Sequence, residues 1–109
     1  MKYGIINQTD LNWEDLSGGI SRQIYSYNDQ IMMVKVKFDK GAVGAPHSHP
    51  HIQSTYVDSG KFEVTIDGET SVIGEGDGFM VLPDLIHGCV CLEAGCLIDV
   101  FIPMREDFL

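Results

Sequence analysis

The sequence predicts a single all-β domain folded as a sandwich or a barrel, and three observations support this fold class. The chain has 109 residues, near the commonest domain size, and its 44% hydrophobic residues can fill one core. Turn signals recur at intervals of roughly eight to twelve residues, which is typical of sandwiches and barrels. Helical periodicity is weak throughout, and only residues 10–16 could form a short helical turn.

The first predicted strand covers residues 30–38. Its last five residues alternate between apolar side chains and lysines, so that one face of the strand is apolar and the other is charged. An Asp-Lys-Gly turn follows at residues 39–41. We therefore expect this strand to contribute one face to the core.

Glycine-containing turns separate the remaining strands. Ser59-Gly60 divides two apolar runs, Asp67-Gly68 is a strong hairpin signal, and residues 74–78 form a glycine-rich turn cluster. We expect a sandwich or barrel over about residues 30–102, preceded by an N-terminal arm over residues 1–29, within one domain of residues 1–109. The further predicted strands cover residues 53–58, 61–66, 69–73, 79–82, 87–92 and 96–102.

Charge and cysteine content limit the classes of partner and compartment. The net charge of −9 argues against a nucleic acid or a membrane surface as a partner. The first residues contain no apolar signal-peptide core, and no apolar run reaches the length of a membrane span. Three cysteines, an odd number, do not make a disulfide framework and fit a reducing compartment. We expect a soluble, cytoplasmic protein.

Histidines cluster in the middle of the chain. His47, His49 and His51 lie within five residues, and His87 lies further along. Imidazole is the commonest metal ligand in proteins, and side chains at i and i+2 of a strand point to the same face. His47 and His49 on a strand, together with His87, therefore predict a divalent metal site in a β-barrel. His51 stays in register only if the strand remains straight after Pro50, so it is either a further ligand or a residue at the rim.

A carboxylate interrupts the last apolar run. Asp99 lies within residues 96–102, which are otherwise apolar, and an unpaired buried carboxylate costs roughly several kcal/mol. Alternation places Asp99 and Phe101 on one face, which could be the barrel interior. Asp99 would be tolerated where a metal or substrate needs it, or where it pairs with Arg22 or Arg105.

Three further residues have two readings each. Phe101 is either plain core or a wall beside a bound ligand. Arg105 is either a solvated charge near the chain end or a clamp for a carboxylate, which its planar guanidinium suits. Cys89 would share a face with His87, and it is either a small buried thiol or a ligand or nucleophile.

The histidine segment resembles the first cupin motif. Gly41 is followed after five residues by His47-x-His49, then after three residues by Gln53 and after six by Gly60. The cupin family usually has glutamate where this chain has Gln53. These positions carry the first half of the resemblance.

A second stretch resembles the second cupin motif, with Gly76 followed after five residues by Leu82-x-Asp84 and after two more by His87. The resemblance covers about residues 30–102. It implies a double-stranded β-helix, the jelly-roll barrel of the cupins, holding one divalent metal ion. The ligands that it implies are His47, His49, Gln53 and His87.

Residues 47–53 and 99–109 together resemble the KdgF group of small cupins. That group opens the ring of 4,5-unsaturated monouronates from pectin or alginate to give linear 5-keto-4-deoxyuronate, and a glutamine ligand is the rule in it. The resemblance implies functional roles for Asp99, Phe101 and Arg105. It also implies a small anionic sugar acid as substrate and, by analogy with small cupins, a homodimer.

The implied ligand set has a consequence for charge. Three neutral imidazoles and one amide leave the full +2 of a divalent cation uncompensated, so the site should prefer an anionic ligand, such as a carboxylate with a neighbouring oxygen. The same ligands suit zinc, nickel, iron, manganese or cobalt, so the metal's identity stays open.

The role of Asp99 in the mechanism and the functional class of the protein each have alternatives. Asp99 could act as general base, general acid or both while a metal stabilises the developing enolate. The same ligands also fit an Fe(II)-dependent cupin dioxygenase, and a non-catalytic sugar-binding cupin is a further alternative.

Overall fold

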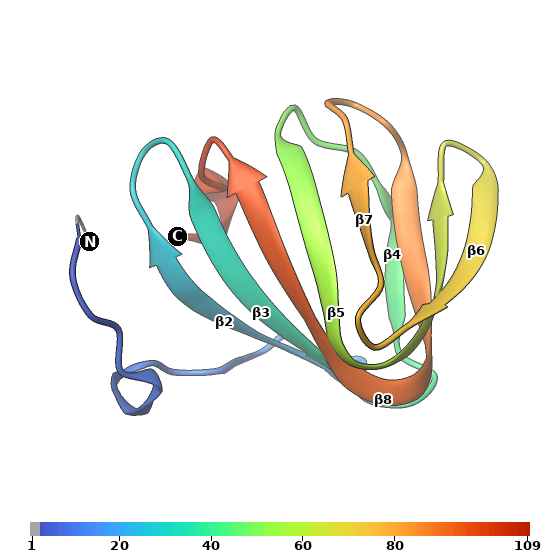
Figure 1. The fold of residues 1–109 in the computed structure, drawn as a ribbon, viewed down its shortest axis with the longest axis horizontal. Helices are drawn as coiled ribbons and strands as arrows, with labels where there is room; N and C mark the ends of the chain where they lie inside the picture. Colours follow the sequence, from blue (N-terminus) through green and yellow to red (C-terminus); the bar gives the residue numbers. More distant parts are fainter. Residues whose placement is uncertain (1–2) are drawn as a thin grey trace.

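Two long strands form the frame of an all-β barrel (Figure 1). β5 (Ile52–Ile66) and β8 (His87–Ile102) pair antiparallel along most of their length and bend together near their midpoints. The computed structural model describes residues 3–109. The bend lies at one end of the molecule, and the first residues of both strands lie at the other end (Figure 1).

The bend divides one eight-stranded sheet into two halves that face each other. The C-terminal part of β8 and the N-terminal part of β5 belong to the first half, and their other parts belong to the second. The first half also contains β1 (Glu14–Asp15), β2 (Ile20–Tyr27), β3 (Met32–Phe38) and β7 (Gly78–Val81). The second half also contains β4 (Val43–His47) and β6 (Glu69–Gly74).

Glycine makes the bend possible. A Cβ atom on Gly95 would collide with the backbone oxygen of Ser59, and one on Gly60 would lie 2.6 Å from the backbone oxygen of Glu93. Gly60 also has a φ of +86°, a conformation that other residues rarely adopt. The register between β5 and β8 shifts between Val57 and Phe62, so the two strands stay paired while they turn the corner.

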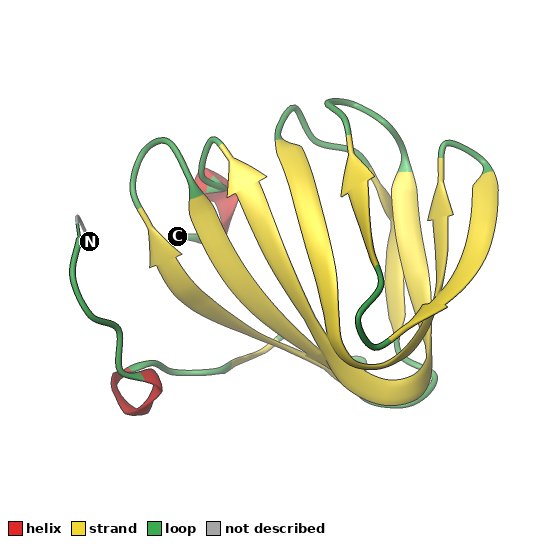
Figure 2. Ribbon diagram, in the orientation of Figure 1, coloured by secondary structure: helices red, strands yellow, loops and turns green. Residues whose placement is uncertain are grey.

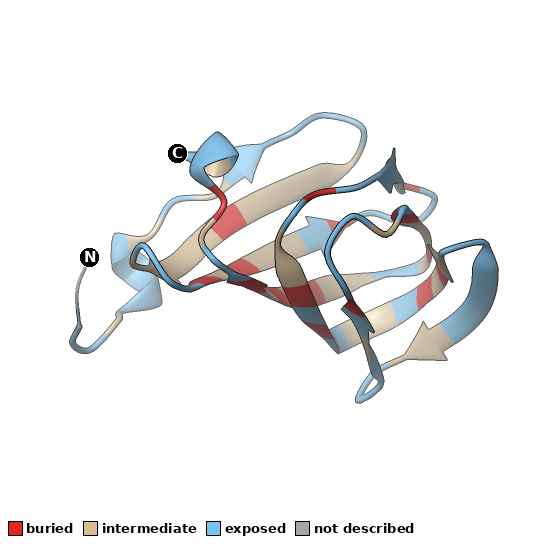
Figure 3. Cartoon of the chain, turned by 90° about the horizontal axis from the view of Figure 1, so that it is seen from above, coloured by how far each residue is buried: buried red, intermediate tan, exposed pale blue. Residues whose placement is uncertain are grey.

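Burial alternates along the strands as expected for a barrel wall (Figure 3). In β5, for example, Gln53, Thr55 and Val57 are buried, whereas the residues between them are exposed. The larger apolar cluster lies near the bend and the smaller one beside the C-terminal segment. These clusters comprise Phe38, Ala42, Val57, Phe62, Val64, Cys91 and Leu97, and Met32, Val34 and Phe101.

Two pairs of predicted strands are each one strand. The predicted strands 53–58 and 61–66 are continuous in β5, and 87–92 and 96–102 are continuous in β8. The glycines between them bend the chain and do not reverse it. The Asp67-Gly68 hairpin is confirmed, because β5 pairs directly with β6 across this turn.

The expectation for the N-terminal part was incomplete. The segment predicted as an arm, residues 1–29, contains β1 and β2, and β2 pairs with β3 along its whole length. The helical turn predicted at residues 10–16 was wrong, because that segment contains β1. A short 3-10 turn, η1 (Gln8–Asp10), precedes it, and the other helix is η2 (Glu106–Phe108), as Figure 2 shows.

Two expectations about the chain, the absence of a signal-peptide core and of a membrane span, can be compared with the structure. Met1 and Lys2, which belong to the segment read for a signal peptide, lie outside the described residues. Among residues 3–109, no helix is long and apolar enough to cross a membrane.

Candidate metal centre

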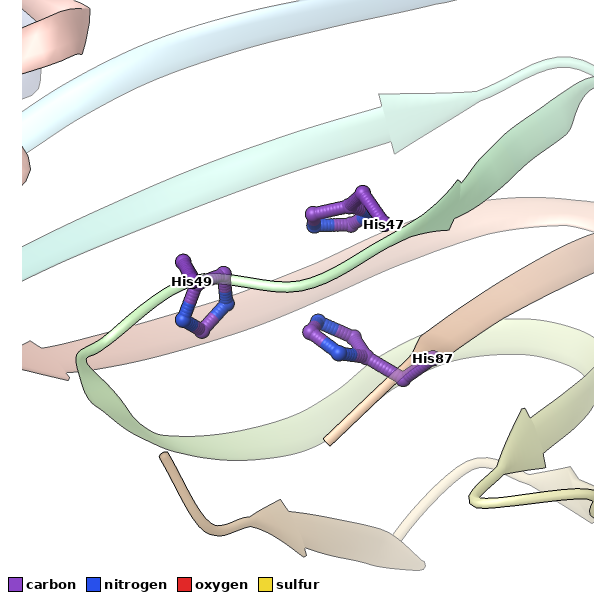
Figure 4. A group of neighbouring side chains, drawn as sticks. All are labelled: His47, His49 and His87. Carbon is purple, nitrogen blue, oxygen red and sulfur yellow. The ribbon is translucent and has the colours of Figure 1, made fainter. Parts of the chain in front are cut away.

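Three imidazole rings converge at the end of the barrel away from the bend (Figure 4). His47 ends β4, His87 begins β8, and the two residues are paired across these strands. Their ring centroids are 4.4 Å apart, and the ring of His49 lies 4.8 Å from that of His87. One ligand nitrogen from each of the three rings lies within 4.8 Å of the others. These three side chains could therefore hold one metal ion.

The loop after β4 places His49. The sequence analysis assumed that His47 and His49 share one strand, but β4 ends at His47. The backbone carbonyl of His49 instead accepts a 2.8 Å hydrogen bond from the backbone N–H of Asp84. This bond anchors the loop so that the two rings still lie close, with centroids 5.6 Å apart.

Backbone carbonyls orient all three rings and fix the tautomer of His47 and His87. Nδ1 of His47 and Nδ1 of His87 lie 2.9 and 3.0 Å from the carbonyl oxygen two residues earlier in the chain. Nδ1 of His49 lies 3.2 Å from the carbonyl oxygen of His51. Because a carbonyl oxygen only accepts, Nδ1 carries the proton in the neutral rings of His47 and His87, and Nε2 carries the lone pair. The Nε2 atoms of these two rings are therefore potential metal ligands.

Gln53 adds an oxygen to this set. Its side-chain Nε2 donates to Oγ1 of Thr55 over 3.0 Å, which turns the amide oxygen towards the histidines. That oxygen, Oε1, lies 2.9 Å from Nε2 of His49. A neutral His49 ring has one proton for two acceptor oxygens, those of His51 and Gln53, so a cation held between Nε2 and Oε1 would leave that proton on Nδ1 for the His51 carbonyl.

Protonation of the rings is a poor alternative to a cation. Burial is the main cause that lowers the pKa of His49 and of His87 below the usual value for histidine. Nε2 of His87 is buried and has no hydrogen-bond partner among the described residues. The three rings and the Gln53 amide therefore fit one divalent metal ion.

Asp99 lies directly behind the Gln53 amide. Its side chain is buried, with Oδ1 accepting hydrogen bonds from Oγ1 of Thr55 over 2.6 Å and from Nε2 of Gln53 over 3.4 Å. Burial raises the pKa of Asp99 to about 6, against the opposing effects of the Thr55 hydrogen bond and of the charge of Arg105. A carboxyl with such a pKa can both take up and release a proton near neutrality.

The alternative pairing of Asp99 with an arginine is not found. Among the described residues, the ion pair of Arg22 is with Glu14, and that of Arg105 is with Asp107. Sequence reasoning missed Thr55, which donates the shorter of the two hydrogen bonds to Asp99. Thr55 pairs with Asp99 across β5 and β8, and only the register of these strands reveals it.

The C-terminal segment places Arg105 and Phe101 together. The Arg105 side chain is buried, and its guanidinium lies 5.0 Å from the Phe101 ring. Its Nε and Nη2 donate to the two carboxylate oxygens of Asp107 over 2.9 and 2.7 Å. Arg105 is therefore not a solvated charge at the chain end. Phe101 packs with the small apolar cluster, and its ring also faces that of His49 at 5.7 Å.

A cavity of about 210 Å³ joins these groups. It extends from the histidines towards the apolar cluster near the bend, so a ligand could reach both the metal site and the Asp99 carboxyl. Its polar lining includes His47, Gln53, His87, Asp99 and Arg105.

Cys89 and His51 do not join the metal-binding set. Cys89 lines the cavity beside His87, but burial raises its pKa to about 11, so it is a protonated thiol. Nε2 of His51 lies 3.1 Å from the backbone oxygen of Met104. His51 thus connects the histidine loop to the C-terminal segment.

Comparison with known proteins places this site in context. The family described as Cupin domain matches residues 34–101. Pectin degradation protein KdgF of Dickeya dadantii is 47% identical over 110 residues, covering 99% of this chain and 98% of that protein.

Two solved structures are similar over nearly their whole length. KdgF from a Halomonas species is 40% identical, with a TM-score of 0.94, covering 99% of this chain and 100% of the other. An RmlC-like cupin from Shewanella frigidimarina is 43% identical, with a TM-score of 0.93, covering 100% of this chain and 96% of the other.

Proposed function

The chain belongs to the cupin family and to its KdgF group, and from this premise we propose that it opens 4,5-unsaturated monouronates to linear 5-keto-4-deoxyuronate. The Dickeya dadantii relative is a pectin degradation protein, which supports a uronate from pectin, or the corresponding one from alginate, as substrate. The observation that carries the proposal is Asp99, a buried carboxyl with a raised pKa beside the imidazole cluster.

One divalent cation belongs to this site. The lone pairs of three imidazoles and the oxygen of one amide point to its place. When bound, it would supply Lewis-acid stabilisation of the oxygen that becomes negative as the sugar ring opens. Zinc, nickel, iron, manganese and cobalt all suit this donor set. The proposed ligands are His47, His49, Gln53 and His87.

Asp99 moves the proton in the proposed reaction. As a base it takes the proton from the anomeric hydroxyl while the bond between C1 and the ring oxygen breaks, which leaves an aldehyde at C1. As an acid it returns a proton to C4, and the enolate at C5 becomes a ketone. One proton leaves the substrate and one returns, so a single carboxyl ends in its starting state.

Phe101 and Arg105 shape the rest of the site. Phe101 forms the wall against which the sugar ring lies, because its ring lines the cavity beside His49. Arg105 contributes positive charge, and its charge acts on the pKa values of both Asp99 and His49. Together with the neutral ligand set of the metal, this charge favours an anionic sugar acid.

The assembly and compartment are part of the proposal. The outer face of β5, β7 and the C-terminal part of β8 exposes large apolar side chains, which supports a homodimer formed through this face. The three cysteines are free thiols, which supports the cytoplasm as the compartment. The exposed apolar residues of this face are Tyr56, Met80, Leu82 and Ile102.

A time course of ultraviolet absorbance tests the activity. The C4=C5 bond of an unsaturated galacturonate absorbs, and the protein should accelerate the loss of this absorbance. Oxygen uptake with candidate substrates would instead indicate a dioxygenase. Tight sugar binding without any turnover would indicate a binding protein and contradict the proposal.

Metal analysis tests the site separately. Protein purified without added metal should contain one divalent ion per chain, and His49→Ala should lose most of it. His51→Ala is the matched control, because His51 is in the same loop but faces Met104, so this variant should keep its metal. Equal metal in the parent protein and in His49→Ala would remove the proposed ligand set.

A further inference from the structure

A second arginine lines the same cavity. Arg22 lies on the inner face of β2, where it is paired with Val36, and Val36 is paired in turn with Leu97 of β8. All three side chains line the cavity that also contains the Asp99 carboxyl. The side chain of Arg22 is only 14% exposed. Arg22 is a charged residue among apolar neighbours in the cavity wall, and burying its charge is costly unless the charge has a partner.

Phe108 brings the two arginines together. The guanidinium carbon of Arg22 lies 3.9 Å from the centroid of the Phe108 ring, and that of Arg105 lies 4.3 Å from the same centroid. The Phe108 ring also meets the Phe101 ring at 5.7 Å, nearly perpendicular. One aromatic ring of η2 thus holds two positive groups beside the wall of the cavity.

The two guanidinium groups differ in what their donors bind. In Arg105, both donors of the Nε–Nη2 edge are bound to the carboxylate of Asp107. In Arg22, Nη2 makes one long contact of 3.4 Å with the half-exposed Glu14, and Nε is buried with no partner among residues 3–109. A buried, unsatisfied donor of a charged group is costly. The same edge is the one that binds a carboxylate through two parallel hydrogen bonds.

We propose that Arg22 is the residue that binds the carboxylate of the sugar acid, through its Nε–Nη2 edge, with Glu14 as the group that the substrate displaces. Phe108 is then a positioning residue, because it holds the Arg22 guanidinium against the cavity. The inference rests on the proposed function and deepens it. The substrate carboxylate is thereby assigned to Arg22, whose Nε–Nη2 edge is not fully bound. It is not assigned to Arg105, whose Nε–Nη2 edge is bound to Asp107.

Binding of a saturated sugar acid tests the inference without turnover. Calorimetry on the metal-loaded protein would compare galacturonate, which lacks the reactive double bond, with neutral galactose. Arg22→Gln should weaken galacturonate binding by roughly tenfold or more, as expected for lost hydrogen bonds to a charged group, without changing galactose binding. Lys61→Gln is the matched control, because it removes the same charge from an exposed position outside the cavity.

Glu14→Gln provides a variant with the opposite expected sign. It removes the competing carboxylate from an exposed strand, so the fold should be unaffected and galacturonate should bind about two- to fivefold more tightly. Arg22→Lys should bind galacturonate more weakly than the parent protein, because an ammonium group cannot form the two parallel hydrogen bonds. These variants keep the test valid if Arg22→Gln folds poorly.

The outcomes separate this inference from the proposed function. Galacturonate binding that depends on Arg22, without opening of the unsaturated uronate, would support the inference and contradict the ring-opening activity. Turnover with a KM that is unchanged in both Arg22→Gln and Glu14→Gln would overturn the inference and leave the activity standing. Galacturonate affinity that is equal in Arg22→Gln and Lys61→Gln, or absent from the parent protein, would also overturn it.

Discussion

At the scale of single residues, one hydrogen-bond chain explains a buried carboxyl. Thr55 and Gln53 both donate to Asp99, and the Gln53 amide in turn directs its oxygen at His49 of the histidine cluster. The sequence predicted Asp99 as unusual from its apolar surroundings alone. It could not predict Thr55, because a threonine in a strand has no distinguishing pattern and its proximity depends on the register of β5 with β8.

The proposed proton transfer gives a first prediction. Asp99→Asn keeps the shape of the side chain and can still accept from Thr55, but it cannot act as a base. We expect kcat to fall by roughly 10²-fold or more with an unsaturated galacturonate, while metal content and far-ultraviolet circular dichroism stay unchanged. Parent-like turnover would leave Asp99 with a structural role only.

The raised pKa of Asp99 gives a second prediction, for stability. The folded protein holds this proton up to about pH 6, whereas an unfolded chain releases it near pH 4. The contribution of Asp99 to stability is therefore fully present below about pH 4 and is lost as the pH rises through about 6, a loss of about 3 kcal/mol. In the metal-free protein, Asp99→Asn should raise the free energy of unfolding at pH 8 by about 1–3 kcal/mol, and less at pH 4.

Urea unfolding of chelator-treated protein at both pH values measures this difference. Asp58→Asn is the control, because Asp58 is exposed on the outer side of β5, and its substitution should change stability by less than about 0.5 kcal/mol at either pH. A gain from Asp99→Asn that is as large at pH 4 as at pH 8 would contradict the assigned cause.

At the scale of elements, the strands that were predicted best are those with clean alternation. β3 shows alternating apolar residues and lysines and was found within one or two residues of its expected start. β2 was not predicted, because its sequence Ile-Ser-Arg-Gln-Ile-Tyr-Ser-Tyr places polar groups on the inner face, among them Arg22. That polar residue faces the cavity, so the break in the pattern coincides with the site.

Glycine was the other source of error at this scale. Glycines at the bend were read as turns between strands, yet they keep β5 and β8 continuous by letting the two backbones approach. From sequence alone, a glycine that reverses a chain and one that bends a strand look alike. The difference lies in the partner strand, which bends at the same level.

Close approach at the bend gives a third prediction. In Gly95→Ala the new methyl group would collide with the Ser59 backbone, which cannot move without disturbing the pairing of β5 with β8. We expect a loss of stability on the order of 3 kcal/mol, measured by urea unfolding. Gly74→Ala is the matched control, because its methyl group would meet only an ordinary contact at 3.8 Å, and its effect should stay below about 1 kcal/mol.

At the scale of the whole molecule, the first half-sheet exposes an apolar face to solvent. Tyr56, Met80, Leu82 and Ile102 are each at least 47% exposed, and the first, second and fourth lie on three neighbouring strands, with Leu82 directly after the end of β7. Contiguous apolar patches on soluble proteins often mark interfaces. The sequence indicated a dimer by family analogy only, whereas the fold identifies a face that would form it.

The proposed dimer gives a fourth prediction. Met80→Lys places a charge on this face and should raise the dimer dissociation constant at least tenfold, because a desolvated, unpaired charge is costly. Light scattering after size-exclusion chromatography at several concentrations measures it. Val72→Lys, at a similarly exposed position on β6 in the other half-sheet, should leave the assembly unchanged. A monomeric parent protein would contradict the proposed dimer.

The way in which two histidines hold their rings has a consequence for protein design. Nδ1 of His47 and Nδ1 of His87 each donate to the carbonyl oxygen two positions earlier. Three consecutive residues therefore set the orientation of each imidazole ring. His47 and His87 are paired across β4 and β8, whereas the two residues before His87 belong to the loop that precedes β8, so the two tripeptides with this loop form a portable half-site. Grafted together onto another strand pair of the same register, they should carry their ring orientation with them. The remainder of the barrel can then vary in sequence without misaligning this pair.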